Sequence, residues 1–270
     1  MANGLITRAD DFGSAAAADQ AILAGIQRGV LLRNVSCMAV GATVAQDAAA
    51  LAQAAGKVDI GLHFTLNSEW DTVKWTPCAP REKIPTLLDK TGEFYQTTDA
   101  LIEAQPDLEQ ILLELNAQLE RLTRLGLPVR YVDAHMAPDE AIPGLREAMA
   151  DWAQSKGILY VRDYYRFPPA GMPAFAPTEA QYQVNVDTWL DSFVAGEQYV
   201  YFLHPAKLSD ETMAFSYAGV EPGAVAWQRE LEARSVLAPV WEHRTAEREI
   251  TLLRYTQAKP PHGEEERGTL

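Results

Sequence analysis

The residues best suited to chemistry in this chain are carboxylates and imidazoles that follow short apolar segments. They are Asp10, Asp11, His63, Asp133, His135 and His204. One carboxylate and two imidazoles suit a divalent metal ion and leave coordination positions open for water and substrate. Such an ion lowers the pKa of its bound water and polarises a carbonyl group. A second carboxylate then takes a proton from water, and a further histidine protonates a leaving nitrogen.

Each of these residues also has a plainer interpretation. Asp10 and Asp11 are both of a type that caps helices. His63 and His135 are candidates for satisfied core histidines, and His204, which precedes a proline, for a turn residue. Asp133 could be only a hydrogen-bonding residue at a strand end. Their joint occurrence at four strand ends favours a functional site over these separate explanations.

Short apolar segments alternate with helical ones along the chain. This order is typical of βαβ units and a mainly parallel sheet, in which the carboxyl ends of the strands meet at one face. Seven strands favour a TIM-like (β/α) barrel, either incomplete or seven-stranded. The strands are expected at 5–9, 34–40, 58–66, 129–134, 158–162, 199–203 and 250–255, and the helices at 15–28, 43–55, 107–125, 141–155, 180–194 and 224–234.

Two stretches interrupt this alternation. Residues 67–106 are too long for an ordinary connection and carry Trp70 and Trp75, which could stack on a sugar ring or pack the loop itself. A second proline-rich loop covers 166–177. We expect a single domain over 1–257 with 67–106 as an inserted loop, and a loose C-terminal tail at 258–270.

Composition narrows the function classes. The 270 residues carry a net charge of −14, which argues against nucleic acid and anionic membrane surfaces as partners. Cys37 and Cys78 make neither a disulfide framework nor a zinc knuckle. The sequence begins without a signal-peptide pattern, and no apolar run reaches the ~18 residues of a membrane span. A cytoplasmic enzyme is the expectation.

Four motifs in a fixed order resemble those of the YdjC-like carbohydrate deacetylases, a family that includes chitooligosaccharide deacetylases. The resemblance covers roughly residues 4 to 256, and residues 252–255 are similar to the family's last strand. The motifs are Ala9-Asp10-Asp11-Phe12-Gly13, Gly61-Leu62-His63-Phe64, Val132-Asp133-Ala134-His135 and His204-Pro205-Ala206.

The resemblance implies a TIM-like barrel and a divalent ion, magnesium or zinc. It implies Asp11, His63 and His135 as metal ligands. Asp10 would be the general base and His204 the acid, and Asp133 would orient a metal-bound imidazole. The implied reaction is hydrolysis of a C–N bond other than a peptide bond, releasing acetate from an N-acetylated mono- or oligosaccharide. Some members of the family are dimers, so a homodimer is expected by analogy.

The chain departs from the family pattern at two places. Arg8 stands where the family usually has Asn, and Met136-Ala137-Pro138 stand where it often has further histidines. Arg8, Trp70 and Trp75 are the candidate substrate contacts. Two other functions remain open: a metal-dependent sugar isomerase or epimerase, whose sites generally use several carboxylates, and a non-catalytic sugar-binding protein.

Overall fold

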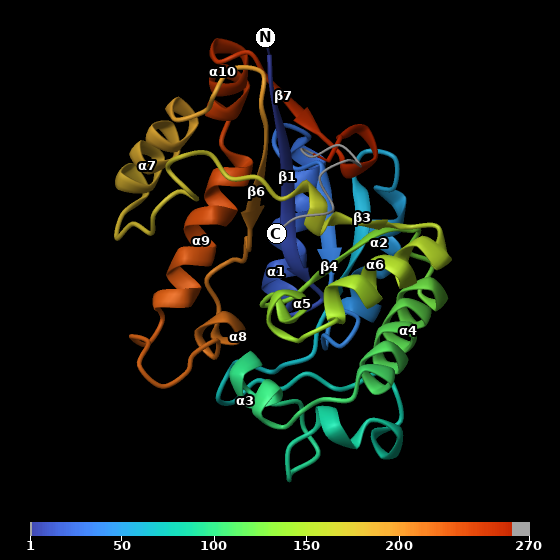
Figure 1. Cartoon of the computed structure of the whole chain (residues 1–270). Helices are drawn as coiled ribbons and strands as arrows, with labels where there is room; N and C mark the ends of the chain where they lie inside the picture. Colours follow the sequence, from blue (N-terminus) through green and yellow to red (C-terminus); the bar gives the residue numbers. More distant parts are fainter. Residues whose placement is uncertain (1, 261–270) are drawn as a thin grey trace.

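A computed structural model describes residues 2–260 and contains one parallel sheet of seven strands (Figure 1). The strands follow one another in the order β5-β4-β3-β2-β1-β6, and β7 also pairs with β1. All seven strands expected from the sequence are present, although several are shorter than expected. They are β1 Asn3–Phe12, β2 Asn34–Cys37, β3 Asp59–Phe64, β4 Val129–Ala134, β5 Leu159–Tyr160, β6 Gln198–Leu203 and β7 Ile250–Leu253.

Strand β1 pairs with three other strands of the sheet. One edge of it pairs with β6, while the other pairs first with β7 at Asn3–Ile6 and then with β2 from Arg8 onward. A parallel strand covered on both faces is normally apolar throughout. In β1, however, the buried residues include Thr7, Arg8, Asp10 and Asp11. Polar groups at such a position indicate a functional requirement that overrides the ordinary core pattern.

The sheet does not close into a full TIM barrel. Within residues 2–260 no ladder joins the outer strands β5 and β6. Strand β5 is only two residues long and passes directly into a 3-10 helix, Val161–Tyr164. Among the described residues, the chain beyond that helix makes one backbone hydrogen bond with β6, from Val200 N to Arg166 O at 3.0 Å. The incomplete, seven-stranded alternative is therefore the architecture that the structure has.

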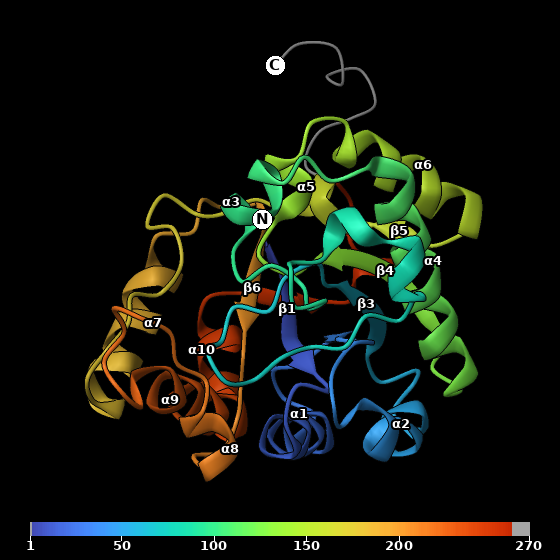
Figure 2. The ribbon, with the colours of Figure 1, turned by 90° about the horizontal axis from the view of Figure 1, so that it is seen from below.

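Helices surround the sheet, as the view in Figure 2 shows. The strongest expected helix, α4, is capped by Asp107, whose carboxylate accepts hydrogen bonds from two backbone N–H groups of the first turn. Helices α3, α5, α8 and α10 were not expected from the sequence. The helices are α1 Ala16–Arg28, α2 Val44–Gln53, α3 Thr98–Glu103, α4 Leu108–Arg124, α5 Pro138–Ala141, α6 Leu145–Lys156, α7 Glu179–Asp191, α8 Asp210–Met213, α9 Ala224–Leu237 and α10 Val240–Glu247.

The inserted loop 67–106 lies at the carboxyl end of the strands. In Figure 1, β1 runs downward from the N-terminus, so the carboxyl ends of the parallel strands face α3 and α8. The buried side chains of the loop include Trp75, Leu87 and Phe94, which belong to the same hydrophobic core as the strands. The loop therefore covers part of the carboxyl-end face of the sheet.

Most of the expected C-terminal tail, residues 261–270, lies outside the described residues. Of its first residues, Lys259 is tied to β6 by hydrogen bonds with the Gln198 side chain. The division of the chain at residue 257 stays a prediction. No helix among the described residues has the length and apolar character needed to cross a membrane.

Candidate functional site

The three expected metal ligands meet at the carboxyl end of the sheet. Asp11 Oδ1 lies 3.4 Å from His63 Nε2 and 3.5 Å from His135 Nδ1. The two imidazole nitrogens are 3.1 Å apart. All three side chains are buried, and each offers one ligand atom to a common point. The sequence separates these residues widely, and parallel strand ends bring them together.

A bulge at the end of β1 lets two adjacent aspartates serve one site. The register of the β1–β2 ladder shifts between Ala9 and Phe12, and Asp11 has φ = 64°. Aspartate is among the few non-glycine residues that adopt this left-handed conformation readily. In a regular strand, neighbouring side chains point to opposite faces. The bulge removes that alternation, so that Asp10 and Asp11 both lie at the carboxyl-end face.

Asp19 holds the turn that follows the bulge. Its carboxylate accepts hydrogen bonds from Gly13 N at 2.5 Å and from the Thr43 hydroxyl at 2.6 Å. Gly13 has φ = 99°, and a Cβ there would lie 2.6 Å from the Val44 Cβ. No motif marks Asp19 in the sequence, and it is fully buried. Helical spacing alone did not distinguish an inward carboxylate from an outward one.

Replacing Asp19 by asparagine is expected to change how stability depends on pH. Burial raises the pKa of Asp19 from 3.8 to about 7, against the lowering effect of its two hydrogen bonds. The folded chain therefore keeps a proton that the unfolded chain loses between these two values. The contribution of Asp19 to wild-type stability falls as pH rises through that window, by at most ~1.4 kcal/mol per pH unit.

Asparagine at position 19 keeps an acceptor for Gly13 and does not titrate. The variant Asp19→Asn should therefore gain stability relative to wild type from pH 5 to pH 7, so that its free energy of unfolding rises relative to that of wild type. Urea unfolding at three pH values in this range measures the difference. A constant difference at all three would contradict the assignment of a raised pKa to Asp19.

His63 is oriented by a carboxylate on the side away from the cluster. Its Nδ1 lies 2.6 Å from Asp133 Oδ2, which leaves Nε2 facing Asp11. A carboxylate behind a metal-binding imidazole fixes its tautomer and ring orientation. Burial opposes the charged ring, but Asp133 and Asp10 outweigh it and raise the pKa of His63 to about 10. A cation at Nε2 would take the place of a proton.

Asp11 is held as a carboxylate by an arginine from α9. Arg229 Nη2 lies 2.8 Å from Asp11 Oδ2. Burial opposes the charge of Asp11, but Arg229 and the two imidazoles keep its pKa well below the usual range. No motif marks Arg229 in the sequence, and it was not expected in the site.

Buried polar atoms without a well-directed hydrogen bond are concentrated here. Among the described residues such side-chain atoms occur on Asp11, Ser14, Asn67, Asp133, His135 and Arg229. All six residues belong to or adjoin the carboxyl ends of β1, β3 and β4, or face them from α9. Buried polar groups normally have partners, and an ion is one explanation for a cluster that lacks them. The unpartnered Oδ1 of Asp11, beside two imidazole nitrogens, fits a divalent cation.

Asp10 is paired with Arg8 beneath the site. Arg8 donates to both carboxylate oxygens of Asp10, at 2.5 and 2.7 Å, and lies 3.0 Å from Asp133 Oδ2. Its other donors reach the hydroxyls of Tyr165 and Tyr255. Only 2% of Arg8 is exposed. This burial gives no support to Arg8 as a substrate contact and favours a role in fixing Asp10.

His204 completes the face on the side of β6. Its Nε2 lies 4.0 Å from Asp10 Oδ2, and 40% of its side chain is exposed. Its backbone N–H donates to the Glu232 carboxylate from α9, and Ala206 N donates to Arg229 O. Helix α9 therefore positions both the His204 segment and Arg229. His204 is the expected site residue that is most open to solvent.

Trp70 and Trp75 are buried, with 5% and 2% exposure. Trp70 stacks on Phe215 at 5.1 Å between ring centroids, and the indole N–H of Trp75 donates to Glu69. Their burial favours the packing interpretation over sugar stacking. Glu69, like Arg229, was not expected in the site; its Oε2 lies 3.1 Å from His135 Nε2.

A solvent-facing aromatic ring lies on the second proline-rich loop. Phe167 is 43% exposed and lies 5.8 Å from the Phe202 ring. Phe202 lies on β6, two residues before His204, which directly follows the strand, and its ring covers the Arg8 guanidinium at 4.2 Å. The loop had been noted in the sequence, but not this residue.

Comparisons with known proteins agree with this geometry. A model of the family described as "YdjC-like protein" matches residues 4–240. A carbohydrate deacetylase of Geobacillus stearothermophilus is 34% identical over 131 residues, 48% of each chain. A chitooligosaccharide deacetylase of Serratia marcescens is 32% identical over 133 residues, again 48% of each. The matches thus span about half the length of these curated relatives.

One solved structure supports the fold. A putative cellobiose-phosphate cleavage protein from Enterococcus faecalis superposes with a TM-score of 0.74 at 22% sequence identity. The superposition covers 95% of this chain and 98% of that one. At this identity the likeness concerns the fold alone, and it extends over the part of the chain that the curated matches leave out.

Proposed function

Because the chain belongs to the YdjC-like protein family, we propose that it is a metal-dependent deacetylase acting on an N-acetylated sugar. The observation that carries the proposal is the buried, unpartnered Asp11 Oδ1, which faces His63 Nε2 and His135 Nδ1. The names of the matched relatives support the sugar as substrate. Only one carboxylate stands among these three groups, so an isomerase that needs several is not favoured.

Asp11, His63 and His135 would hold the ion. A bound divalent cation would polarise the acetyl carbonyl of the substrate and lower the pKa of a bound water. Two imidazoles and one carboxylate favour zinc over magnesium, which prefers oxygen ligands. Arg229 keeps Asp11 ionised, and Asp133 directs the lone pair of His63 toward the ion.

Proton transfer falls to Asp10 and His204. Asp10 accepts a proton from the attacking water, and Arg8 fixes its carboxylate for this purpose. The water oxygen bonds to the acetyl carbon, the C–N bond breaks, and His204 Nε2 donates a proton to the departing amine. The products are acetate and the free amino sugar. His204 Nε2 lies 4.0 Å from Asp10 Oδ2, and this proximity supports the proposal that both act on one substrate group.

The proposal is tested by acetate release. The protein is stripped of metal with a chelator, dialysed, and assayed on N-acetylglucosamine oligomers before and after addition of zinc or magnesium. We expect release to fall to background after stripping and to return with one equivalent of ion per chain. Full activity in protein shown to be metal-free would defeat the mechanism, and an isomeric sugar as product would favour the alternative enzyme class.

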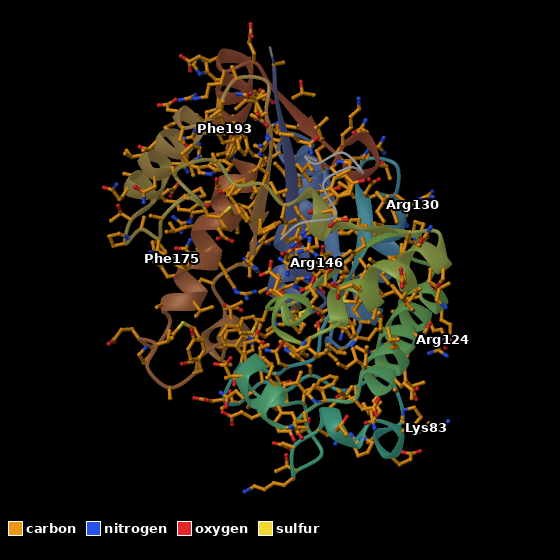
Figure 3. All side chains as sticks on the ribbon, in the orientation of Figure 1. Lys83, Arg124, Arg130, Arg146, Phe175 and Phe193 are labelled. Carbon is orange, nitrogen blue, oxygen red and sulfur yellow. The ribbon has the colours of Figure 1, made fainter. Side chains whose placement is uncertain are left out.

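Phe167 is the residue that we expect to contact the sugar ring. Replacing it by alanine should raise KM for an acetylated oligosaccharide about tenfold, equivalent to ~1.4 kcal/mol of binding, with kcat changed little. Phe175→Ala is the matched control, since Phe175 lies on the same loop, 77% exposed, at the edge of the molecule (Figure 3). Equal effects of the two substitutions would contradict a specific contact at Phe167.

A further inference from the structure

The long loop 67–106 brings a carboxylate to the third metal ligand. Glu69 Oε2 lies 3.1 Å from His135 Nε2, and Glu69 is only 7% exposed. No motif of the family resemblance includes this residue. The contact needs an explanation, because a buried carboxylate is costly unless it is paired.

The two imidazoles of the cluster are arranged in the same way. His63 turns Nε2 toward Asp11 and Nδ1 toward Asp133. His135 turns Nδ1 toward Asp11 and Nε2 toward Glu69. In a neutral imidazole one nitrogen carries the proton, so a carboxylate behind one nitrogen leaves the lone pair on the other. Glu69 therefore stands to His135 as Asp133 stands to His63.

Packing within the loop fixes the Glu69 carboxylate. The indole N–H of the buried Trp75 donates to Glu69 Oε2 at 3.2 Å. The Gln96 side chain donates to the Glu69 carbonyl at 3.0 Å, and the Ser68 hydroxyl accepts from Trp75 N at 2.9 Å. Contacts from both ends of the loop thus converge on the position of one carboxylate.

We propose that Glu69 is a positioning residue for His135, and that through it the loop 67–106 completes the metal site. This inference rests on the proposed function. The contact is an ion-pair contact rather than an aligned hydrogen bond, since His135 Nε2 has no well-directed acceptor. Hydrogen bonds that are long or poorly aligned in an empty site commonly tighten when the site binds its ligand. The plainer role for Glu69 is to accept the Trp75 N–H and stabilise the loop alone.

The first test uses the wild-type protein and zinc alone. Long-range ¹H–¹⁵N correlation spectra of the zinc-bound protein report which nitrogen of His135 carries the proton. We expect the proton on Nε2, toward Glu69, and zinc on Nδ1. A proton on Nδ1 would overturn the inference, and this measurement needs no variant that could fail to fold.

The second test compares zinc affinity between variants, by competition with a chromophoric chelator. Glu69→Gln keeps the size of the side chain and an acceptor for Trp75 but loses the charge, and we expect zinc binding to weaken 10- to 100-fold. Asp71→Asn is the control, because Asp71 is exposed on the same loop. Among the described residues, its side chain accepts a hydrogen bond only from Gln96. Asp71→Asn should bind zinc as wild type does.

The outcomes separate the two proposals. Glu69→Gln that binds zinc with wild-type affinity, and loses only thermal stability, would leave Glu69 as a packing residue and overturn the inference while the metal site stands. Wild-type protein that takes up no zinc, magnesium or other divalent ion would overturn the proposed function, and the inference with it.

Discussion

Replacing His63 by alanine is expected to abolish stoichiometric metal binding and to lower kcat/KM at least ~10³-fold, equivalent to ~4 kcal/mol. His63 Nε2 is one of three ligand atoms, and only Asp11 Oδ1 and His135 Nδ1 would remain. The fold should survive, since Asp133 keeps its contact with Arg8 at 3.0 Å. Metal content by atomic absorption and acetate release measure the two effects.

His243→Ala is the matched control for that substitution. His243 lies on α10 with 76% of its side chain exposed, and its ion-pair contact is with Glu247 on the same helix. Its removal should leave metal content and activity unchanged. A His63→Ala protein that still holds one ion per chain and turns over at the wild-type rate would remove His63 from the site.

Asp10→Asn is expected to lower kcat by ~10²–10⁴-fold, the usual contribution of a general base. An amide does not accept a proton from water at neutral pH, whereas the metal ligands are untouched by the change. Metal content should therefore equal that of wild type, and KM should change little. Steady-state kinetics on metal-saturated protein give kcat and KM separately.

A second variant separates the chemistry of Asp10 from its structural contact. Asp10→Asn leaves the buried Arg8 guanidinium with Asp133 as its remaining carboxylate, so some stability will be lost. The double variant Arg8→Asn/Asp10→Asn also removes the guanidinium that has lost one of its two carboxylates, and we expect it to regain melting temperature but not activity. If the double variant regained turnover, Asp10 would act through Arg8 and not as the base.

The site's main residues could be predicted because strand ends leave a readable pattern. In β1, β3, β4 and β6, polar residues follow apolar runs, and parallel pairing must bring those ends to one face. His63 lies on β3 and His135 directly follows the neighbouring strand β4; the register pairs the two strands from Ile60–Val129 to Phe64–Ala134. The order of the four motifs indicated the family, and the family resemblance implied a role for each site residue.

Several features had no comparable signal. The bulge at Asp11 depends on a local backbone conformation that residue types do not determine. Arg229 and Glu69 reach the site from a helix and a loop whose placement depends on tertiary packing. The barrel stays open because β5 ends after two residues and a 3-10 helix follows, and a run of apolar residues does not show where a strand gives way to such a turn.

The cellular location and the oligomeric state of the protein stay predictions. The expected cytoplasmic location was based on the missing signal-peptide pattern and on the lack of an apolar run of the ~18 residues that a membrane span needs. The homodimer rested on analogy with family members. Size-exclusion chromatography with light scattering would determine the second.

The central claim, that Asp11, His63 and His135 share one divalent ion, is tested most directly by anomalous diffraction. Crystals grown with zinc would be measured on both sides of the zinc absorption edge. We predict one strong peak at coordination distance, ~2.0–2.3 Å, from Asp11 Oδ1, His63 Nε2 and His135 Nδ1. A well-ordered crystal with zinc bound elsewhere, and no peak among these three atoms, would contradict the account.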